Sequence, residues 1–182
     1  MKLHPELDPQ LQHWISQQPL FFVASAPLAA DGHVNLSPRG YDCLRIIDPH
    51  TVAWLDLTGS GNETAAHLQE NGRITLMFCA FQGEARILRL YGRGETLLPG
   101  SAGWKTLRGQ FADLPGARQI IRVAIERIQT SCGYAVPLME PAGERQRLLD
   151  WAQKKGEDGM DSYRESRNTR SIDGAPINIK AK

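Results

Sequence analysis

The segment RITLMFCAFQGEARILRLYGRGE, residues 73–95, decides the fold. Its first nine residues are nearly all apolar, which is typical of a strand buried on both faces. The tripeptide QGE at residues 82–84 follows as a break, and residues 86–95 then place Leu88 and Leu90 on one face of a second strand. Two strands separated by so short a break predict an antiparallel hairpin.

Shorter strands are predicted on both sides of this hairpin. Four of them share hairpin spacing on the N-terminal side: residues 20–25, 33–37, 42–47 and 51–57. Asp31-Gly32 and Asp48-Pro49 are the turn signals between them. A last strand is predicted at residues 119–130, where apolar residues alternate with others. This pattern favours an antiparallel meander over parallel crossover units.

Helical periodicity predicts helices that flank these strands: residues 9–18, 63–70 and 102–111. Pro19 ends the first helix and Asn71-Gly72 ends the second. Many short strands, 11 prolines and 17 glycines predict a mainly β domain, a small barrel with flanking helices, over residues 1–140. Residues 141–182 differ in character. They predict a helix at 144–155, a glycine-rich break and a polar end, forming an appendage that packs on the barrel or on a dimer partner.

Composition excludes several classes of protein. The 182 residues carry 21 Lys and Arg against 20 Asp and Glu, a net charge of +1 that argues against coating a polyanion. No apolar run reaches the roughly 20 residues that span a bilayer, and the first residues do not resemble a signal peptide. Three distant cysteines favour a reducing compartment, and the histidines lack the spacing of metal ligands. We therefore expect a cytoplasmic protein that binds no metal, membrane or nucleic acid.

The stretch LTGSGNET, residues 57–64, carries the chemistry. It joins a predicted strand end to a predicted helix start, where free N–H groups and the helix dipole form a seat for phosphate. The Ser60 and Thr64 hydroxyls and the Asn62 amide could add hydrogen bonds. The alternative is structural: Ser60 and Glu63 have the spacing of a capping box, Ser60 or Asn62 only caps the helix, and the glycines only turn the chain.

Arginines near this stretch favour the phosphate interpretation. Arg39, in the element Ser37-Pro38-Arg39-Gly40, follows the second predicted strand, and Arg45 lies on the third. A guanidinium there would pair bidentately with phosphate oxygens. The alternative is that both are solvated charges at the barrel rim, and Arg39 is the stronger candidate for a phosphate contact.

The strand order and these motifs resemble the pyridoxamine 5′-phosphate oxidase-like, FMN-binding split β-barrels. The resemblance covers roughly residues 20–130 and includes the Ser-Pro-Arg-Gly element, the Gly-Ser-Gly-Asn-Glu-Thr helix start and the RILRLYG strand. It is closest to a branch that ends in Ser-Ile-Asp-Gly-x-Pro, here residues 171–176. It implies a homodimer with FMN at the subunit interface. The predicted cofactor-binding residues are Ser37, Arg39, Leu57, Thr58, Ser60, Gly61, Asn62, Glu63, Thr64 and Ile87.

Departures from the family pattern limit the activity that the resemblance implies. The oxidase has Ser-Arg-Lys where this chain has Asn62-Glu63-Thr64, and a flavin-contacting Gln where this chain has Ile87. Its basic C-terminal substrate motif has no counterpart in residues 172–182. These changes argue against oxidation of pyridoxamine phosphate itself. Flavin binding tolerates them better, because backbone N–H groups can hold much of the phosphate.

The predicted function is therefore an FMN-dependent oxidoreductase that acts on a small organic molecule or electron donor. No catalytic side chain stands out. The alternatives are a non-catalytic flavin carrier or sensor, and a related barrel that holds deazaflavin or haem. Asp56 could accept a hydrogen bond from the flavin or cap a turn. His67 is expected on an exposed helix surface, and the basic tail residues, Arg164 among them, on a solvated face.

Overall fold

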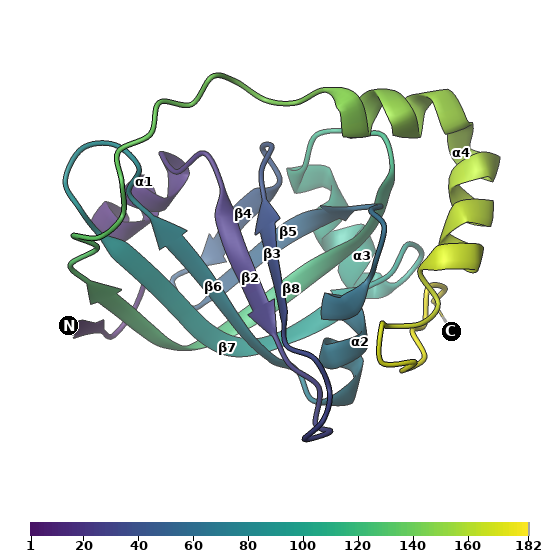
Figure 1. The fold of residues 1–182 in the computed structure, drawn as a ribbon, viewed down its shortest axis with the longest axis horizontal. Coiled ribbons are helices and arrows are strands. Elements are labelled where there is room, and N and C mark those ends of the chain that lie inside the picture. Colours follow the sequence, from purple (N-terminus) through teal and green to yellow (C-terminus); the bar gives the residue numbers. More distant parts are fainter. Residues whose placement is uncertain (182) are drawn as a thin grey trace.

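The computed structural model describes residues 1–181, and a single antiparallel sheet forms the body of the molecule (Figure 1). Its strand order is β3-β2-β6-β7-β8-β5-β4, with β1 paired to β8. The strands are β1 (Lys2–His4), β2 (Phe21–Ser25), β3 (Asn35–Arg39), β4 (Leu44–Asp48), β5 (Thr51–Leu57), β6 (Arg73–Cys79), β7 (Ile87–Leu97) and β8 (Ala117–Ser131). All the pairings are antiparallel, as hairpin-spaced strands require.

The long strands β7 and β8 curl the sheet into a barrel. Their register shifts between Tyr91 and Gly92, and such a bulge bends a strand pair. A Cβ at Gly92 would collide with the Ala124 carbonyl, so the close approach of the two backbones requires glycine there. The sheet edges β3 and β4 come near each other, but no strand pairing joins them within the described residues. The barrel is therefore split.

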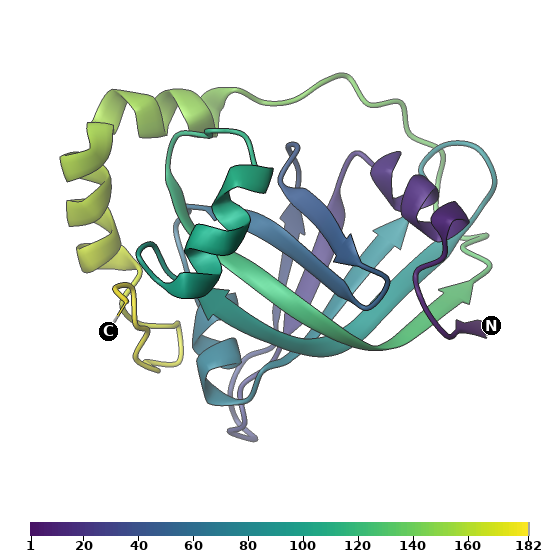
Figure 2. The same cartoon turned by 180° about the vertical axis from the view of Figure 1, so that it is seen from behind.

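A single apolar core fills the barrel. Alternate residues of the strands point inward, and Trp54 at its centre packs edge-on against Phe21, with ring centroids 5.9 Å apart. Helix α1 (Pro9–Ser16) covers one end with Leu11 and Ile15, and Asp8 caps its first turn. Figure 2 shows α3 (Ala102–Leu107) toward the other end, followed by the 3-10 turn η1 (Arg108–Gln110).

The C-terminal residues pack on the barrel of their own chain. Helix α4 (Arg147–Arg167) is kinked at Gly156, where φ is 67°, and rests on the Gly116 turn through Ala152 and Met160. The chain beyond α4 runs alongside α2 (Glu63–Glu70), and Ile177 is buried against it (Figure 1). The end of the chain is thereby placed beside the loop that joins β5 to α2.

The predicted class, a mainly β split barrel with flanking helices, is confirmed. The helix at residues 63–70 is also confirmed, and Gly72 ends it with a φ of 70°. Several boundaries differ from the prediction: β3 and β4 each begin two residues later, and α3 ends at Leu107 rather than at residue 111. The tail helix begins at Arg147 and continues through its glycine kink to Arg167. Within residues 1–181, no helix combines the length and apolarity that crossing a membrane requires.

Candidate functional site

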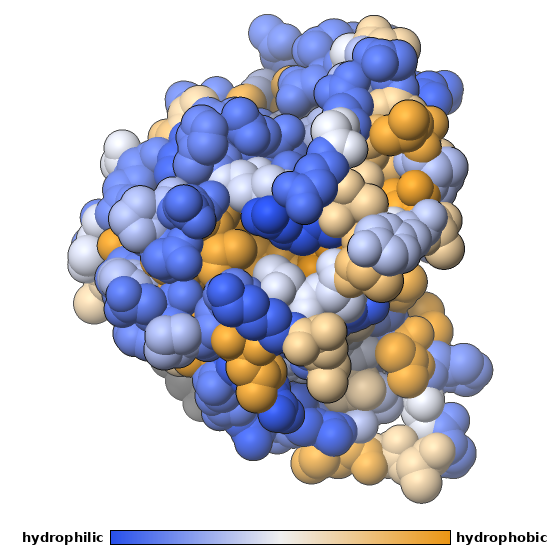
Figure 3. All heavy atoms as spheres, turned by 90° about the vertical axis from the view of Figure 1, so that its left-hand side faces the viewer, coloured by the Kyte–Doolittle hydropathy of each residue, from blue (hydrophilic) through white to orange (hydrophobic). Residues whose placement is uncertain are grey.

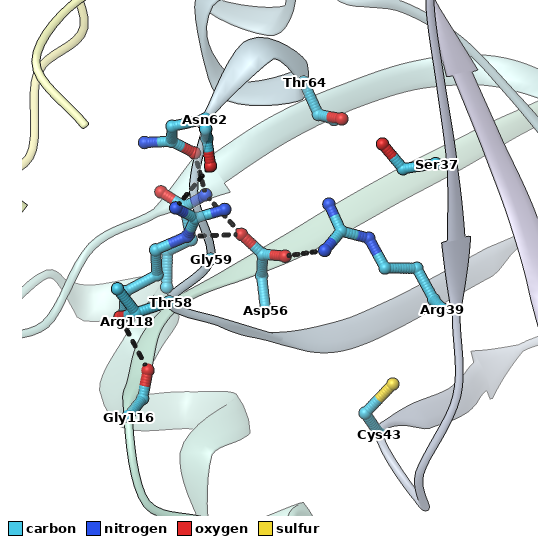
Figure 4. Close-up of polar contacts among 12 residues, drawn as sticks. Ser37, Arg39, Cys43, Asp56, Thr58, Gly59, Asn62, Thr64, Gly116 and Arg118 are labelled. Carbon is cyan, nitrogen blue, oxygen red and sulfur yellow. Dashed lines mark hydrogen bonds and ion pairs between the residues drawn. The ribbon is translucent and has the colours of Figure 1, made fainter. Parts of the chain in front are cut away.

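The β5–α2 loop and strand β3 form one corner of the barrel. The sheet curls far enough to bring Ser37 and Arg39 of β3 opposite the start of α2 (Figure 4). Asn62 and Thr64 at this helix start are both buried. The structure therefore brings together residues that lie more than twenty positions apart in the sequence.

The first turn of α2 offers free backbone donors. The first helical hydrogen bond runs from the Ala66 N–H to the Asn62 carbonyl, at 3.2 Å. Among residues 1–181, no acceptor takes the N–H of Glu63, Thr64 or Ala65. Such groups at the positive end of a helix dipole bind anions well.

The predicted capping box is wrong. Helix α2 begins at Glu63 with Asn62 as its N-cap, and Asn62 makes no capping hydrogen bond through its side chain. Ser60 lies two residues before the N-cap and is exposed. Glu63 points to the tail, where its Oε2 accepts the N–H of Ile172 at 3.0 Å. The backbone donors of this turn are consequently left for another partner.

Asp56 is the buried centre of the corner, and its contacts differ from both predicted roles. Its carboxylate lies 3.0 Å from Arg39 Nη1 and 2.8 Å from Arg118 Nε. Burial alone would raise the pKa of Asp56, but the guanidiniums of Arg118 and then Arg39 outweigh it, and the pKa is lowered. These three side chains carry one net positive charge. Arg39 Nε is also buried and has no hydrogen-bond partner within the described chain.

A hydrogen bond links β3 to α2. Asn35 Nδ2 donates to Thr64 Oγ1 at 3.2 Å, and Ser37 Oγ donates to Asn35 Oδ1 at 3.2 Å. Thr64 accepts in this contact, so its own O–H remains available as a donor. The corner thus combines backbone N–H groups, a hydroxyl and a guanidinium, the donor set that a phosphate requires.

The loop itself is held from behind by the buried side chains of Arg118 and Asn168 and by the partly buried Arg164. Arg118 Nη1 donates to the Gly61 carbonyl at 2.8 Å, and Asn168 Nδ2 donates to the Gly59 carbonyl at 3.2 Å. Arg164 Nε donates to Thr58 Oγ1 at 2.9 Å. The prediction that Arg164 lies on a solvated face is therefore wrong, because α4 returns to the barrel and brings this residue onto the loop.

Ile87, which was predicted to bind the cofactor, lies away from the corner of its own chain. It pairs with Ser131 at the C-terminal end of β8, whereas Leu57 pairs with Ala117 at the other end of that 15-residue strand. The two residues therefore lie at opposite ends of β8. The remaining predicted residues, Leu57, Thr58, Gly61 and Glu63, belong to the corner or its loop.

His67 is buried, so the prediction that it lies on an exposed surface is wrong. Its Nδ1 lies 2.9 Å from Ser25 Oγ, because the short helix α2 packs this face on β2. The tail covers Ala65 and Ala66 on another face of the same helix. An eight-residue helix covered on two sides has little exposed surface left.

Sequence reasoning missed Arg118, Gln119 and Asn168. Gln119 Nε2 donates to Asp56 Oδ2 at 2.8 Å and to Asn62 Oδ1 at 2.9 Å, tying the buried carboxylate to the helix start. The register pairs Asp56 directly with Gln119. The only signal in the sequence was an Arg-Gln pair at the start of an apolar alternation, and its meaning depends on knowing that β5 and β8 are neighbours.

A curled antiparallel sheet with free N–H groups at a helix start beside its open seam defines a class of small split barrels. The family model described as pyridoxamine 5′-phosphate oxidase matches residues 7–132. The chain is 38% identical over 193 residues to the pyridoxamine 5′-phosphate oxidase family protein ustO of Aspergillus flavus, which covers 95% of this chain and 76% of that protein. The chain belongs to the pyridoxamine 5′-phosphate oxidase family.

Solved structures share the fold at low sequence identity. HupZ of Group A Streptococcus is 21% identical with a TM-score of 0.52, covering 72% of this chain and 97% of that one. HutZ, the heme storage protein of Vibrio cholerae, is 13% identical with a TM-score of 0.50, covering 69% of this chain and 94% of that one. These similarities concern the fold alone.

Proposed function

We propose that the protein binds FMN, with the phosphate at the start of α2, and that it is a flavin-dependent oxidoreductase of a small organic molecule. One observation carries the proposal: free N–H groups of Glu63 and Thr64 face a corner whose buried side chains are net positive. Membership of the pyridoxamine 5′-phosphate oxidase family supports the choice of cofactor.

The residues of the corner fit the phosphate group of this cofactor. The N–H groups of Glu63 and Thr64 would donate to its oxygens, together with the Thr64 hydroxyl and the Arg39 guanidinium. The unpartnered Arg39 Nε supports this contact, because a buried donor without an acceptor costs about 1–3 kcal/mol. Leu57 and Thr58 would adjoin the rest of the cofactor. When bound, FMN supplies hydride or electron transfer, and the protein orients it.

We propose that the active protein is a homodimer with the flavin at the subunit interface. The edge strand β3 beside the corner exposes Leu36, and an apolar groove of about 550 Å³ lies next to it, lined by Pro19, Leu20, Pro38, Tyr41, Phe81 and Met139. Figure 3 shows exposed apolar side chains at the end of the molecule that carries α1. A second subunit could cover these surfaces and bring its own Ile87 to the corner.

A comparison of FMN with riboflavin tests the phosphate seat. We expect FMN to bind at least tenfold more tightly than riboflavin in a fluorescence titration, because riboflavin lacks the phosphate that the corner would hold. Equal affinities would reject the phosphate seat. Light scattering with and without FMN would test the dimer, and a monomer saturated with FMN would reject it.

A second measurement separates an enzyme from a flavin carrier. An oxidoreductase is expected to have its bound flavin bleached by a nicotinamide donor and reoxidised by an acceptor. A carrier would show neither change. Because the heme storage protein HutZ shares the fold, a hemin titration and a deazaflavin titration serve as comparisons, and a preference for either over FMN would overturn the proposed cofactor.

A further inference from the structure

A cleft of about 500 Å³ lies behind the β5–α2 loop. Its walls are α4, the C-terminal residues 179–181 and the turn at residues 98–100. Its polar lining consists of three cations, two acids and three amides: Arg118, Arg164, Lys180, Asp161, Glu165, Asn62, Gln119 and Asn168. Figure 4 shows the Asn62 amide nitrogen pointing away from Arg39, so the cleft and the flavin corner lie on different sides of Asn62.

The Asn62 amide has an unsatisfied donor, and its orientation follows from the hydrogen bonds around it. Gln119 Nε2 donates to the Asp56 carboxylate, so Gln119 must present its NH₂ group on that side. The same NH₂ group donates to Asn62 Oδ1 at 2.9 Å, which fixes the oxygen of Asn62 toward Gln119. Asn62 Nδ2 is then buried without a partner among the described residues. A buried donor of this kind calls for an acceptor.

Cations dominate the same cleft. Arg118 Nε donates to Asp56, and its Nη1 donates to Gly61 and Asn168. Its Nη2 donates to no group within residues 1–181. Burial lowers the pKa of Arg164, Asp161 opposes that effect, and Arg118 adds to it. Two guanidiniums therefore repel each other across a partly buried space, and an anion between them would relieve that repulsion.

The acidic groups of the cleft do not cancel this charge. Asp161 is paired with Arg164 at 2.9 Å, and Glu165 with Lys180 at 2.7 Å. Both carboxylates are more than half exposed, whereas the Arg118 side chain is 5% exposed. The lining residues thus carry one net positive charge, and the buried Arg118 shares the Asp56 carboxylate with Arg39.

We propose that this cleft is a second binding site, specific for a small carboxylate or phosphate anion. An oxygen of the anion would accept from Asn62 Nδ2 and Arg118 Nη2, and Arg164 and Lys180 would hold its charge. The site is separate from the flavin corner, because Arg39 and Thr64 do not line it.

Titration of sodium phosphate and sodium acetate into the full chain tests the site. Saturation with FMN fills the corner first, so that phosphate reports the cleft alone. If FMN does not bind, the same titration is made on the Arg39→Ala variant, in which the corner no longer competes with the cleft for phosphate. Failure of the flavin proposal can then be distinguished from failure of the anion proposal. Sodium chloride keeps the ionic strength constant. We expect a saturable shift of the Asn62 side-chain NH₂ signal in ¹⁵N-edited NMR, and the tighter anion identifies the chemistry of the ligand.

Three variants decide whether the binding is specific. Arg164→Gln should weaken it about tenfold, and Lys180→Gln, at the exposed rim, about threefold. Lys154→Gln makes the same charge change on an exposed part of α4 outside the cleft and should leave the affinity unchanged. If Arg164→Gln does not fold, Lys180→Gln decides. Absence of saturation, or equal weakening in Lys180→Gln and Lys154→Gln, would overturn the proposal.

Discussion

The two sides of the β5–α2 loop differ in how their polar groups are satisfied. On the side of α4 and β8, the carbonyls of Gly59 and Gly61 accept hydrogen bonds from Asn168 and Arg118. On the side of β3, N–H groups of the first turn of α2 and Arg39 Nε have no acceptor among residues 1–181. The backbone of the loop is thus held from behind, although the Asn62 amide nitrogen there is free, and the backbone donors in front are held ready for a ligand at little cost in ordering.

Asp56 connects the two sides, because Arg118 contacts it from behind and Arg39 from the front. Arg118 is 5% exposed and Arg39 22%, so the two ion pairs should differ in what their loss costs. The rear arginine should matter mainly for folding stability, and the front arginine mainly for ligand affinity.

The largest effect is expected when the rear side is broken. Arg118→Met should lower the free energy of unfolding by about 3–5 kcal/mol, because it leaves the buried Asp56 charge with one partner fewer. Urea denaturation of flavin-free protein measures this loss. The double variant Asp56→Asn with Arg118→Met is the control and should recover part of it. A loss below about 1 kcal/mol would contradict the structural role of the rear side.

The next effect concerns the front side. Arg39→Ala should weaken FMN binding by about 1.5–3 kcal/mol, the value of a charge-assisted hydrogen bond, or roughly 10- to 150-fold. Riboflavin binding should change little, since Arg39 is assigned to the phosphate. The flavin-free variant should lose less stability than Arg118→Met. An unchanged FMN affinity would show that the anchor is misplaced.

The contrast between the front and the rear of the loop also explains which contacts could be predicted from the sequence. The hairpin at residues 73–95 and the start of α2 at Glu63 were predictable, because their signals lie within a few adjacent residues. The front side was predicted in part for the same reason, through the glycine-bracketed loop. Predicting Arg39 as a phosphate contact required only that the strand carrying it be recognised as a neighbour of this loop.

The rear side could not be predicted, because its contacts depend on which elements become neighbours. Asp56 and Arg118 are 62 positions apart and meet only after β5 pairs with β8. Arg164 and Thr58 are 106 positions apart and meet only after α4 kinks at Gly156. A polar residue in a tail gives no local sign that it will be buried on a loop of the barrel.

The smallest effect is expected at the exposed edge of the tail, where the contacts that hold the tail on the barrel should be weak. His33 Nδ1 lies 2.6 Å from Asp173, whose other oxygen accepts the His33 N–H at 2.8 Å. The hydrogen bond to Asp173 raises the pKa of His33, and the pairing lowers the pKa of Asp173. Protonated His33 is favoured in the folded state. Its contribution to the stability of the folded tail is therefore complete below pH about 6.5, and it is lost as the pH rises through the raised pKa of His33.

Asp173 also stabilises the folded tail, but with the opposite pH dependence. Its contribution is present above pH about 3.9 and is lost as the pH falls through the lowered pKa of Asp173. The two contributions together predict that the tail is held best between pH about 4 and 6.5. Amide hydrogen exchange at residues 171–177, corrected for its intrinsic pH dependence, should show less protection at pH 8 than at pH 6. Asp173→Asn should remove this difference. A difference that persists in Asp173→Asn would mean that the pH dependence comes from a group other than the His33–Asp173 pair, and it would contradict the prediction.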